Sequence, residues 1–347
     1  MRARMLDLSP SASALQSTRR SRRALSTIAC LAFIPVCWLL GACRHYSGDL
    51  GLTKVVFQAD WYPQPEHGGF YTALVKGYYK DEGLDVTIVS GGPYVYPYQQ
   101  VATGGAQFGM GASDHVLESV AAGQPLVAVA ATMQHDPQGI MVRKDSPVRT
   151  FADLNGRTVA VQAGSTWFHY LVTRYSLQNV REIPSMMSVA NFIADPNFIQ
   201  QAFATSEPYF ARQAGIETRV LLVSESGFMP YRVVYTTRDF LAQHPDTVSK
   251  FVRASLRGWQ EYLNDPGPAH AAVSKLNPAL NPQWMQFTWQ ALRDGHFVAG
   301  DDARGAQLGQ MDPARWATMY KQLRELKVIE TEFDPQIAYT LRFLPLE

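Results

Sequence analysis

The stretch QADWYPQPEHGGFYTALVKGYYKDEGLDVTIVSGG (58–92) decides the fold. It starts inside VVFQAD (55–60), an apolar run with the composition of a β-strand. Its end, DVTIVSGG (85–92), is a second strand that stops at a glycine turn. Between them, apolar residues recur at three- and four-residue spacing over residues 68–79, which predicts a helix. A strand, a helix and a further strand predict a parallel βαβ unit.

The same alternation continues toward the C-terminus. AQFGMG (106–111), PLVAVAATM (125–133) and RTVAVQAG (157–164) are further apolar strands, each followed by a turn or a helical segment. Residues 267–347 are mostly helical, and we assign them to packing on the first part of the fold. Strands and helices that alternate in this way predict an α/β fold with mainly parallel sheets.

The N-terminal segment has the features of an export leader. Arginines precede residues 24–42, which carry no charge, and Leu40-Gly41-Ala42-Cys43 resembles a bacterial lipobox. We expect residues 1–42 to be a lipoprotein signal peptide, Cys43 to carry lipid, and residues 43–53 to form a tether. A single transmembrane anchor is the alternative, but Pro35 and the small residues before Cys43 favour cleavage.

Charge and cysteine content exclude several classes of protein. The chain has 347 residues, of which 31 are basic and 30 acidic, so it has no electrostatic footprint for nucleic acid. The three cysteines are Cys30, Cys37 and Cys43, and no CxxC pair indicates a zinc site. After removal of a leader with six arginines and one aspartate, the net charge falls from +1 to −4. Because the cysteines are few and form no CxxC pair, we expect no disulfide and no bound metal.

Taken in order, these segments resemble the SsuA/THI5-like (NMT1-like) family. The resemblance covers residues 54–270 and is carried by 58–92, QPLVAVAATM (124–133), TFADLNGRTVAV (150–161), SEPYFA (206–211) and TTRDFLAQHPDTVSKFVRA (236–254). It implies a periplasmic-binding-protein-like type II fold with two α/β lobes around a ligand cleft. On this basis we expect residues 54–145 and 235–347 in lobe 1, and residues 146–234 in lobe 2.

Most proteins of this family are extracytoplasmic solute-binding components of ABC importers. The resemblance therefore implies a monomer that binds a small molecule, delivers it to an inner-membrane permease and uses no cofactor. A sensor subunit that presents its ligand to a membrane kinase is an alternative. We expect the protein in the periplasm or cell envelope, held at the membrane by its lipid.

One branch of the family is enzymatic. Its pyrimidine synthases consume their own histidine and a bound pyridoxal phosphate. His115 in AQFGMGASDH (106–115) matches that histidine, but Gly111 stands where the synthase has its Schiff-base lysine. GFMPY (227–231) stands where the synthase has a cysteine-rich iron motif. Without the amine and the thiolates, we expect no enzymatic activity.

Candidate ligand residues lie after strands, because open α/β sheets bind ligands at the carboxyl ends of their strands. Trp61 would stack on a ring or pack, and His67 would bind the ligand or cap a helix. Residues 164–166 would hold an anion at a helix start or serve as an ordinary cap. Glu207 would accept a bond from an amino group or order its turn. The full set is Asp60, Trp61, His67, Tyr71, Tyr96, Ser113, Asp114, His115, Gly164, Ser165, Thr166, Asn191, Phe192 and Glu207.

The predicted cleft is acidic and aromatic. Asp60, Asp114 and Glu207 with several aromatic residues favour a planar, amine-bearing heteroaromatic, such as a thiamine-pyrimidine precursor or a riboflavin-like compound. No cationic clamp for a small anion is evident in the sequence, so a sulfonate, taurine or nitrate is the second choice.

Overall fold

The computed structural model describes residues 51–301 and 308–344, which belong to one compact unit, Leu50–Glu347. The predicted signal peptide (1–42), Cys43 and most of the predicted tether lie outside the described residues. Among the described helices, none is long and apolar enough to cross a membrane.

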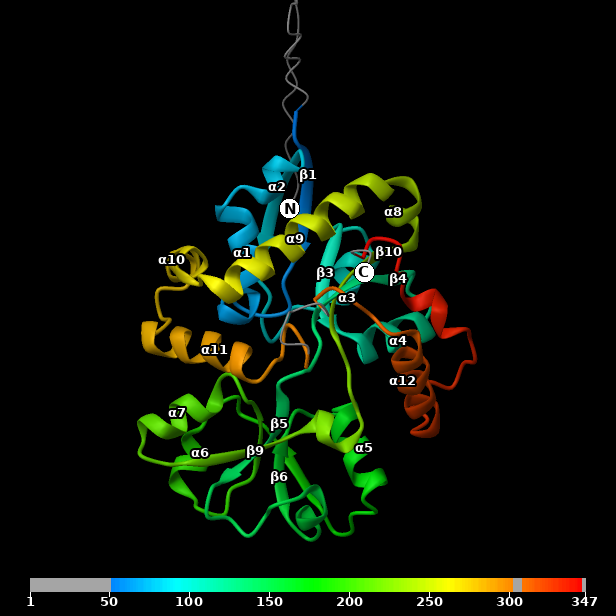
Figure 1. Ribbon diagram of the computed structural model, residues 1–347. Helices are drawn as coiled ribbons and strands as arrows, with labels where there is room; N and C mark the ends of the chain where they lie inside the picture. Colours follow the sequence, from blue (N-terminus) through cyan, green and yellow to red (C-terminus); the bar gives the residue numbers. More distant parts are fainter. Residues whose placement is uncertain (1–50, 302–307, 345–347) are drawn as a thin grey trace, which may run out of the picture. The chain divides into compact units, whose positions relative to one another are not determined.

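Two five-stranded mixed sheets form the two lobes (Figure 1). The strand order of the first sheet is β2 (Leu84–Val89), β1 (Thr53–Gln58), β3 (Phe108–Ala112), β10 (Arg232–Thr237) and β4 (Leu126–Met133). That of the second is β7 (Arg181–Pro184), β6 (Thr158–Val161), β8 (Gln200–Phe203), β5 (Gln138–Arg143) and β9 (Thr218–Leu222). This arrangement confirms the predicted two-lobe α/β fold. The expectation of mainly parallel sheets is wrong, because each sheet has two parallel and two antiparallel pairings.

Helices cover both faces of the first sheet. On one face lie α1 (Gly68–Val75), α2 (Tyr78–Asp81), α8 (Arg238–Gln243), α9 (Pro245–Asn264) and α10 (Gly267–Leu276). On the other lie α3 (Pro97–Ala102), α4 (Ser113–Ala121) and α12 (Pro313–Glu325), with the 3-10 helix η4 (Pro335–Ala338). Along β10, Val234 packs into the first core while Val233 and Tyr235 pack into the second, as the two-residue period of a strand requires.

The second lobe repeats this layering on a smaller scale. Ile140 and Val142 of β5 pack with α5 (Thr166–Arg174) and η2 (Phe151–Leu154) on one face. Met141, between them, packs on the other face with α6 (Ala190–Ala194) and α7 (Glu207–Gln213). Three further elements border the cleft: η1 (Pro65–His67), η3 (Val223–Ser226) and α11 (Pro282–Asp294).

The chain crosses between the lobes twice, after β4 and after η3. Residues through 145 were expected in the first lobe and residues 146–234 in the second. Instead, β5 hydrogen-bonds with β8 and β9 of the second sheet, and β10 belongs to the first sheet from Arg232 onward. An apolar strand has the same composition in either sheet, so its sequence does not say which neighbours it pairs with. The first crossing therefore lies at residues 134–137, and the second ends where β10 begins at Arg232.

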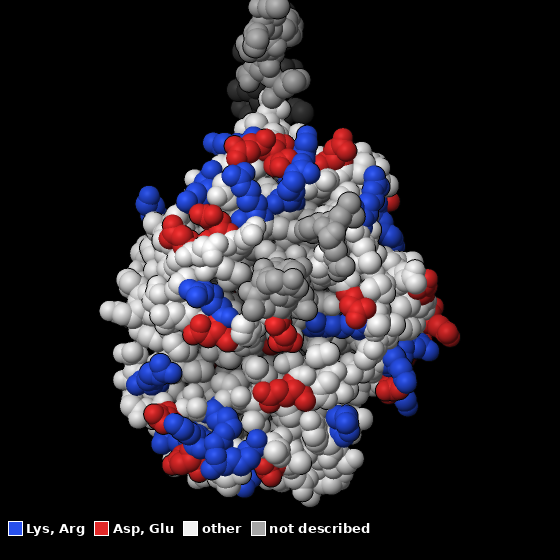
Figure 2. Space-filling model, viewed as in Figure 1, with Lys and Arg blue, Asp and Glu red and all other residues white. Residues whose placement is uncertain are grey.

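Close packing of α1 on α9 explains the glycine pair that follows His67. A Cβ added at Gly69 would overlap the Trp259 ring, and one added at Gly258 would overlap the Gly69 carbonyl oxygen. The pair Gly68-Gly69 therefore lets two helices approach each other and is buried in the first lobe. Figure 2 shows basic and acidic side chains interspersed on the face of the molecule in view.

Candidate functional site

A cavity of about 610 Å³ lies between the lobes, a size typical of small-molecule sites. The lobes contact each other on both sides of it. On one side, Thr205 Oγ1 donates a hydrogen bond to Glu66 Oε1 (2.9 Å). On the other, Thr166 Oγ1 donates to Glu118 Oε1 (2.8 Å). These contacts describe a closed arrangement of the cleft.

A charged cluster lies at the base of the cleft, where the crossings meet the first sheet. Arg232 pairs with Asp60 Oδ2, and its other terminal nitrogen lies 3.6 Å from Asp136 Oδ2. Asp60 Oδ1 also lies 2.9 Å from His67 Nε2. Asp136 comes from the first crossing and Arg232 from the end of the second, so this pair ties the crossings together.

The cluster sets the charge of its members. Burial alone would raise the pKa of Asp60, but the Arg232 guanidinium and His67 together hold it below its ordinary value. Burial raises the pKa of Asp136, which Arg232 offsets only in part. Among the described residues that line the cavity, Arg232 is the one Lys or Arg. Because two carboxylates already neutralise it, Arg232 offers little free positive charge to a ligand.

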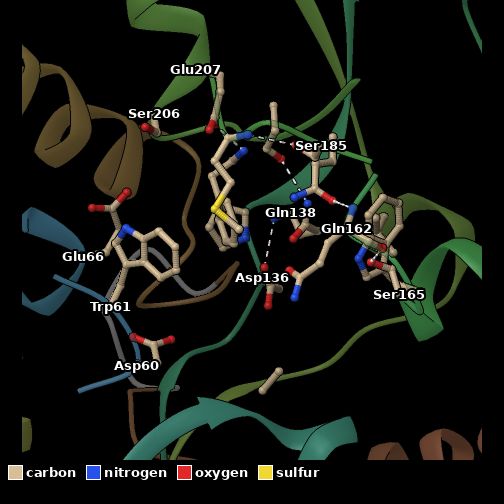
Figure 3. Close-up of a pocket in the computed structure, with 18 of the residues that line it drawn as sticks. Asp60, Trp61, Glu66, Asp136, Gln138, Gln162, Ser165, Ser185, Ser206 and Glu207 are labelled. Atoms are coloured by element: carbon tan, nitrogen blue, oxygen red, sulfur yellow. Dashed lines mark hydrogen bonds between the residues drawn. The ribbon is translucent and has the colours of Figure 1, made fainter. Parts of the chain in front are cut away.

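Two further carboxyls, Glu66 and Glu207, belong to the lining of the cavity. Burial raises the pKa of Glu66 to about 7, although the bond from Thr205 opposes the shift. Burial also raises the pKa of Glu207, whose Oε2 accepts a bond from the Phe203 backbone (2.7 Å). Figure 3 shows Trp61 and Glu66 on one side of the pocket and Ser206 and Glu207 on another. This part of the cleft can accept hydrogen bonds.

The remaining lining is aromatic and amide-bearing. Trp61 and Trp284 come from the first-lobe side and Trp167 from the second, and rings of this size suit a flat ligand. Gln138 and Gln162 each bring an amide, which can both donate and accept. The cleft thus combines surfaces for stacking with groups that read the edge of a planar ring.

Eight of the fourteen predicted residues line this cavity. They are Asp60, Trp61, His67, Asp114, His115, Gly164, Ser165 and Glu207. The Ser165 hydroxyl donates to Gln162 O (2.6 Å) and that of Thr166 to Glu118, so both are engaged within the protein. This leaves the predicted anion site at residues 164–166 without a free hydroxyl.

Six predicted residues are not part of the lining. Tyr71 and Phe192 are core residues of the first and second lobes, and Tyr96 is 68% exposed before α3. Ser113 Oγ accepts a bond from the Tyr231 backbone, and Asn191 is exposed on α6. Thr166 makes the inter-lobe bond to Glu118. The side chains of these six residues point into a core, into solvent or to a structural partner.

Several lining residues were not predicted from the sequence, notably Glu66, Asp136, Gln138, Arg232 and Trp284. Arg232 begins a strand instead of following one, and Trp284 lies in the helical region assigned to packing on the first lobe. This helix, α11, contacts both lobes: its Trp284 ring lies 5.6 Å from the ring of Phe210 on α7 of the second lobe. Glu66 is adjacent to the predicted His67, and this was the one available signal.

One group of described side chains has metal-ligand spacing. Atoms of Asp114, His115 and Glu118 lie within 4.8 Å of one another on α4. Glu118 already accepts the Thr166 hydroxyl, and acidic groups of this kind occur without a metal, so the cluster alone assigns no ion.

Comparison with known proteins agrees with this geometry. The NMT1/THI5-like family profile matches residues 64–269, more than half of the chain. Riboflavin-binding protein RibY of Chloroflexus aurantiacus is 25% identical over 313 residues, which cover 85% of this chain and 87% of that protein. The 4-amino-5-hydroxymethyl-2-methylpyrimidine phosphate synthase THI11 of Saccharomyces cerevisiae is 25% identical over 248 residues, 66% of this chain and 72% of that one.

Solved structures show the same fold at lower identity. The periplasmic aliphatic sulphonate-binding protein SsuA of Escherichia coli superposes with a TM-score of 0.61 at 15% identity, covering 82% of this chain and 91% of that one. Its likeness concerns the two-lobe architecture alone. The chain belongs to the NMT1/THI5-like family.

Proposed function

We propose that this protein is the extracytoplasmic solute-binding component of an ABC importer, and that its lobes close over a planar, nitrogen-bearing heteroaromatic ligand. A riboflavin-like compound is the first choice and a thiamine-pyrimidine precursor the second. The protein would pass the ligand to a permease in the inner membrane, stay attached through lipid on Cys43, and act as a monomer. The likeness to RibY supports the flavin choice.

The state of Arg232 is the observation that carries this proposal. A sulfonate or nitrate pairs most strongly with a cation that is free to bind it. Here Asp60 and Asp136 occupy the guanidinium, and the other carboxyls of the lining, Glu66 and Glu207, offer an anion no positive charge. A neutral ring system with N–H donors needs no free cation, and it can stack on Trp61.

An enzyme of the pyrimidine synthase type is the competing function, because several relatives carry that name. The packing around Gly111 argues against it. A Cβ at this position would overlap the Tyr98 hydroxyl, and the Tyr98 ring stacks on Tyr235 with centroids 4.8 Å apart. By the family resemblance, the Schiff-base lysine of the synthases would stand at Gly111. The space that a lysine side chain would need there is filled by Tyr98. All three cysteines also precede residue 44.

A thermal-shift series with the purified protein tests the proposal. We expect stabilisation by riboflavin or by 4-amino-5-hydroxymethyl-2-methylpyrimidine, and none by taurine, methanesulfonate or nitrate. A ligand at 100 times its Kd adds about 2.7 kcal/mol of stability. Stabilisation by the sulfonates alone would reject the heteroaromatic ligand. An aldimine absorbance band after incubation with pyridoxal phosphate would reject the binding-only function.

A further inference from the structure

Glu66 lies where the two lobes meet and where the cavity begins. Its side chain is 8% exposed, and Oε1 accepts the hydroxyl of Thr205 from the second lobe. Its other oxygen, Oε2, is buried and has no hydrogen-bond partner among the described residues. Glu66 lines the cavity, so this carboxyl uses one oxygen between the lobes, while its other oxygen has no partner among the described residues.

Thr205 is held in place on the far side of this contact. Its backbone oxygen accepts a bond from Thr288 Oγ1 of α11 (2.8 Å), and both threonines are fully buried. The same helix contacts α7 through the Tyr209 and Phe287 rings, whose centroids lie 5.7 Å apart. The Glu66–Thr205 bond thus lies in a buried contact between the two lobes.

The unpartnered oxygen determines the kind of group that Glu66 can receive. A buried acceptor without a donor costs free energy, and a ligand that supplies the donor removes that cost. Above its pKa of about 7, Glu66 is ionised and only accepts hydrogen bonds, whereas the protonated carboxyl also offers one O–H donor. Glu207 adds a second carboxyl to the same part of the lining. The matching ligand group is therefore an amino group, a ring N–H or a protonated ring nitrogen.

Resting on the proposed function, we propose that Glu66 couples ligand selection to lobe closure. One carboxyl oxygen takes an N–H donor of the heteroaromatic ligand, and the other takes the Thr205 hydroxyl of the second lobe. When Glu66 is ionised, its buried oxygen rejects a ligand that has only acceptors at that edge, so the same side chain reads the ligand and bridges the lobes.

Two substitutions separate these roles. Glu66→Gln keeps a carbonyl oxygen for Thr205 and replaces the oxygen that faces the ligand with an NH2 donor. Thr205→Val removes the hydroxyl that bridges the lobes and leaves Glu66 intact. Matched controls are Glu182→Gln, at an exposed residue of β7, and Thr318→Val, whose hydroxyl bonds within α12.

The experiment combines ligand titration with hydrogen–deuterium exchange of the full chain. Riboflavin and 4-amino-5-hydroxymethyl-2-methylpyrimidine are the probes, and exchange is followed in the segment 203–213. We expect Glu66→Gln to weaken probe binding at least tenfold with unchanged exchange in the free protein. We expect Thr205→Val to speed exchange in that segment and to weaken binding less. Both controls should behave as wild type.

The outcomes distinguish the inference from the function beneath it. If wild type binds neither probe, the proposed function fails. If wild type and Glu66→Gln bind a probe equally, the function stands and the role of Glu66 is overturned. Unchanged exchange in Thr205→Val overturns the closure contact whether or not a probe binds.

Discussion

At the scale of single residues, Glu66 carries a charge that the folded protein stabilises poorly. Burial raises its pKa to about 7 from an ordinary value of 4.5, with His67, Glu207 and Tyr262 as the titratable groups around it. Between pH 4.5 and 7 the folded state binds a proton that the unfolded state lacks. Stability therefore falls as pH rises through this window, by about 3 kcal/mol for this group.

Glu66→Gln should then stabilise the ligand-free protein at pH 8 and change it little near pH 4.5. Glutamine is neutral throughout and still accepts the Thr205 hydroxyl. Melting temperatures of variant and wild type across pH 4.5–8.5 give the difference, with Glu182→Gln as the exposed control. A pH-independent difference would contradict the raised pKa.

Arg232 has the opposite role, because it compensates two buried carboxylates. Replacing it with Gln leaves Asp60 and Asp136 without their cation and should cost about 3–5 kcal/mol at pH 7. In wild type, the contribution of Asp60 is present above its ordinary pKa and is lost as pH falls through the lowered folded value. The penalty of the variant should therefore shrink below pH 4.

Chemical denaturation at pH 7 and at low pH measures this difference. The control is Arg253→Gln, which breaks a surface pair with Glu82 and should cost at most about 1 kcal/mol. Equal losses in the two variants would show that the cleft cluster is no more important to stability than a surface ion pair.

At the scale of elements, α12 holds the hinge. Arg315 donates to Gln134 O of the first crossing (2.6 Å) and to Met229 O (2.7 Å) and Pro230 O (3.1 Å) of the second. Its guanidinium also lies 3.6 Å from the Tyr231 ring centroid. One side chain from the C-terminal region thus fixes both segments that must move when the lobes open.

Arg315→Met should loosen the crossings and leave the sheets in place. We expect faster hydrogen–deuterium exchange in segments 134–143 and 227–232, and weaker ligand binding because the closed geometry is less populated. Arg324→Met is the control, because Arg324 lies on the same helix and bonds Ile329 O, away from both crossings. Equal exchange in both variants would leave α12 with no role in the hinge.

The elements also mark what the sequence could predict. Residues 58–92 gave the correct βαβ unit because apolar periodicity reports the local structure of each segment. The prediction assigned β5 to the wrong lobe and α11 to the first lobe alone. It was wrong because the local composition of a segment does not show which distant segments it contacts. Asp60 and Glu207 were found at a strand end and a helix start, whereas Arg232 was missed because it reaches the cleft from the first residue of an antiparallel strand.

At the scale of the whole molecule, the fold and the family followed from an ordered set of motifs, although each motif alone is weak. The ligand did not follow in the same way. Its chemistry depends on which of several carboxyls is already paired, and pairing between Asp60, Arg232 and Asp136 joins residues up to 172 positions apart. The acidic and aromatic composition of the cleft indicates a class of ligand. The unpartnered oxygen of Glu66 indicates where an N–H donor of that ligand would bind.

At the same scale, the proposed attachment to the membrane depends on one thiol, that of Cys43. We expect the full chain, expressed in a bacterium, to incorporate an alkyne-tagged fatty acid at Cys43 and to sediment with membranes, because two acyl chains suffice for stable anchoring. Cys43→Ala should abolish the label, whereas Cys30→Ala and Cys37→Ala should label as wild type. If Cys43→Ala is labelled equally, or if the mass of the wild-type chain retains residues 24–42, the segment is an anchor and not a cleaved leader.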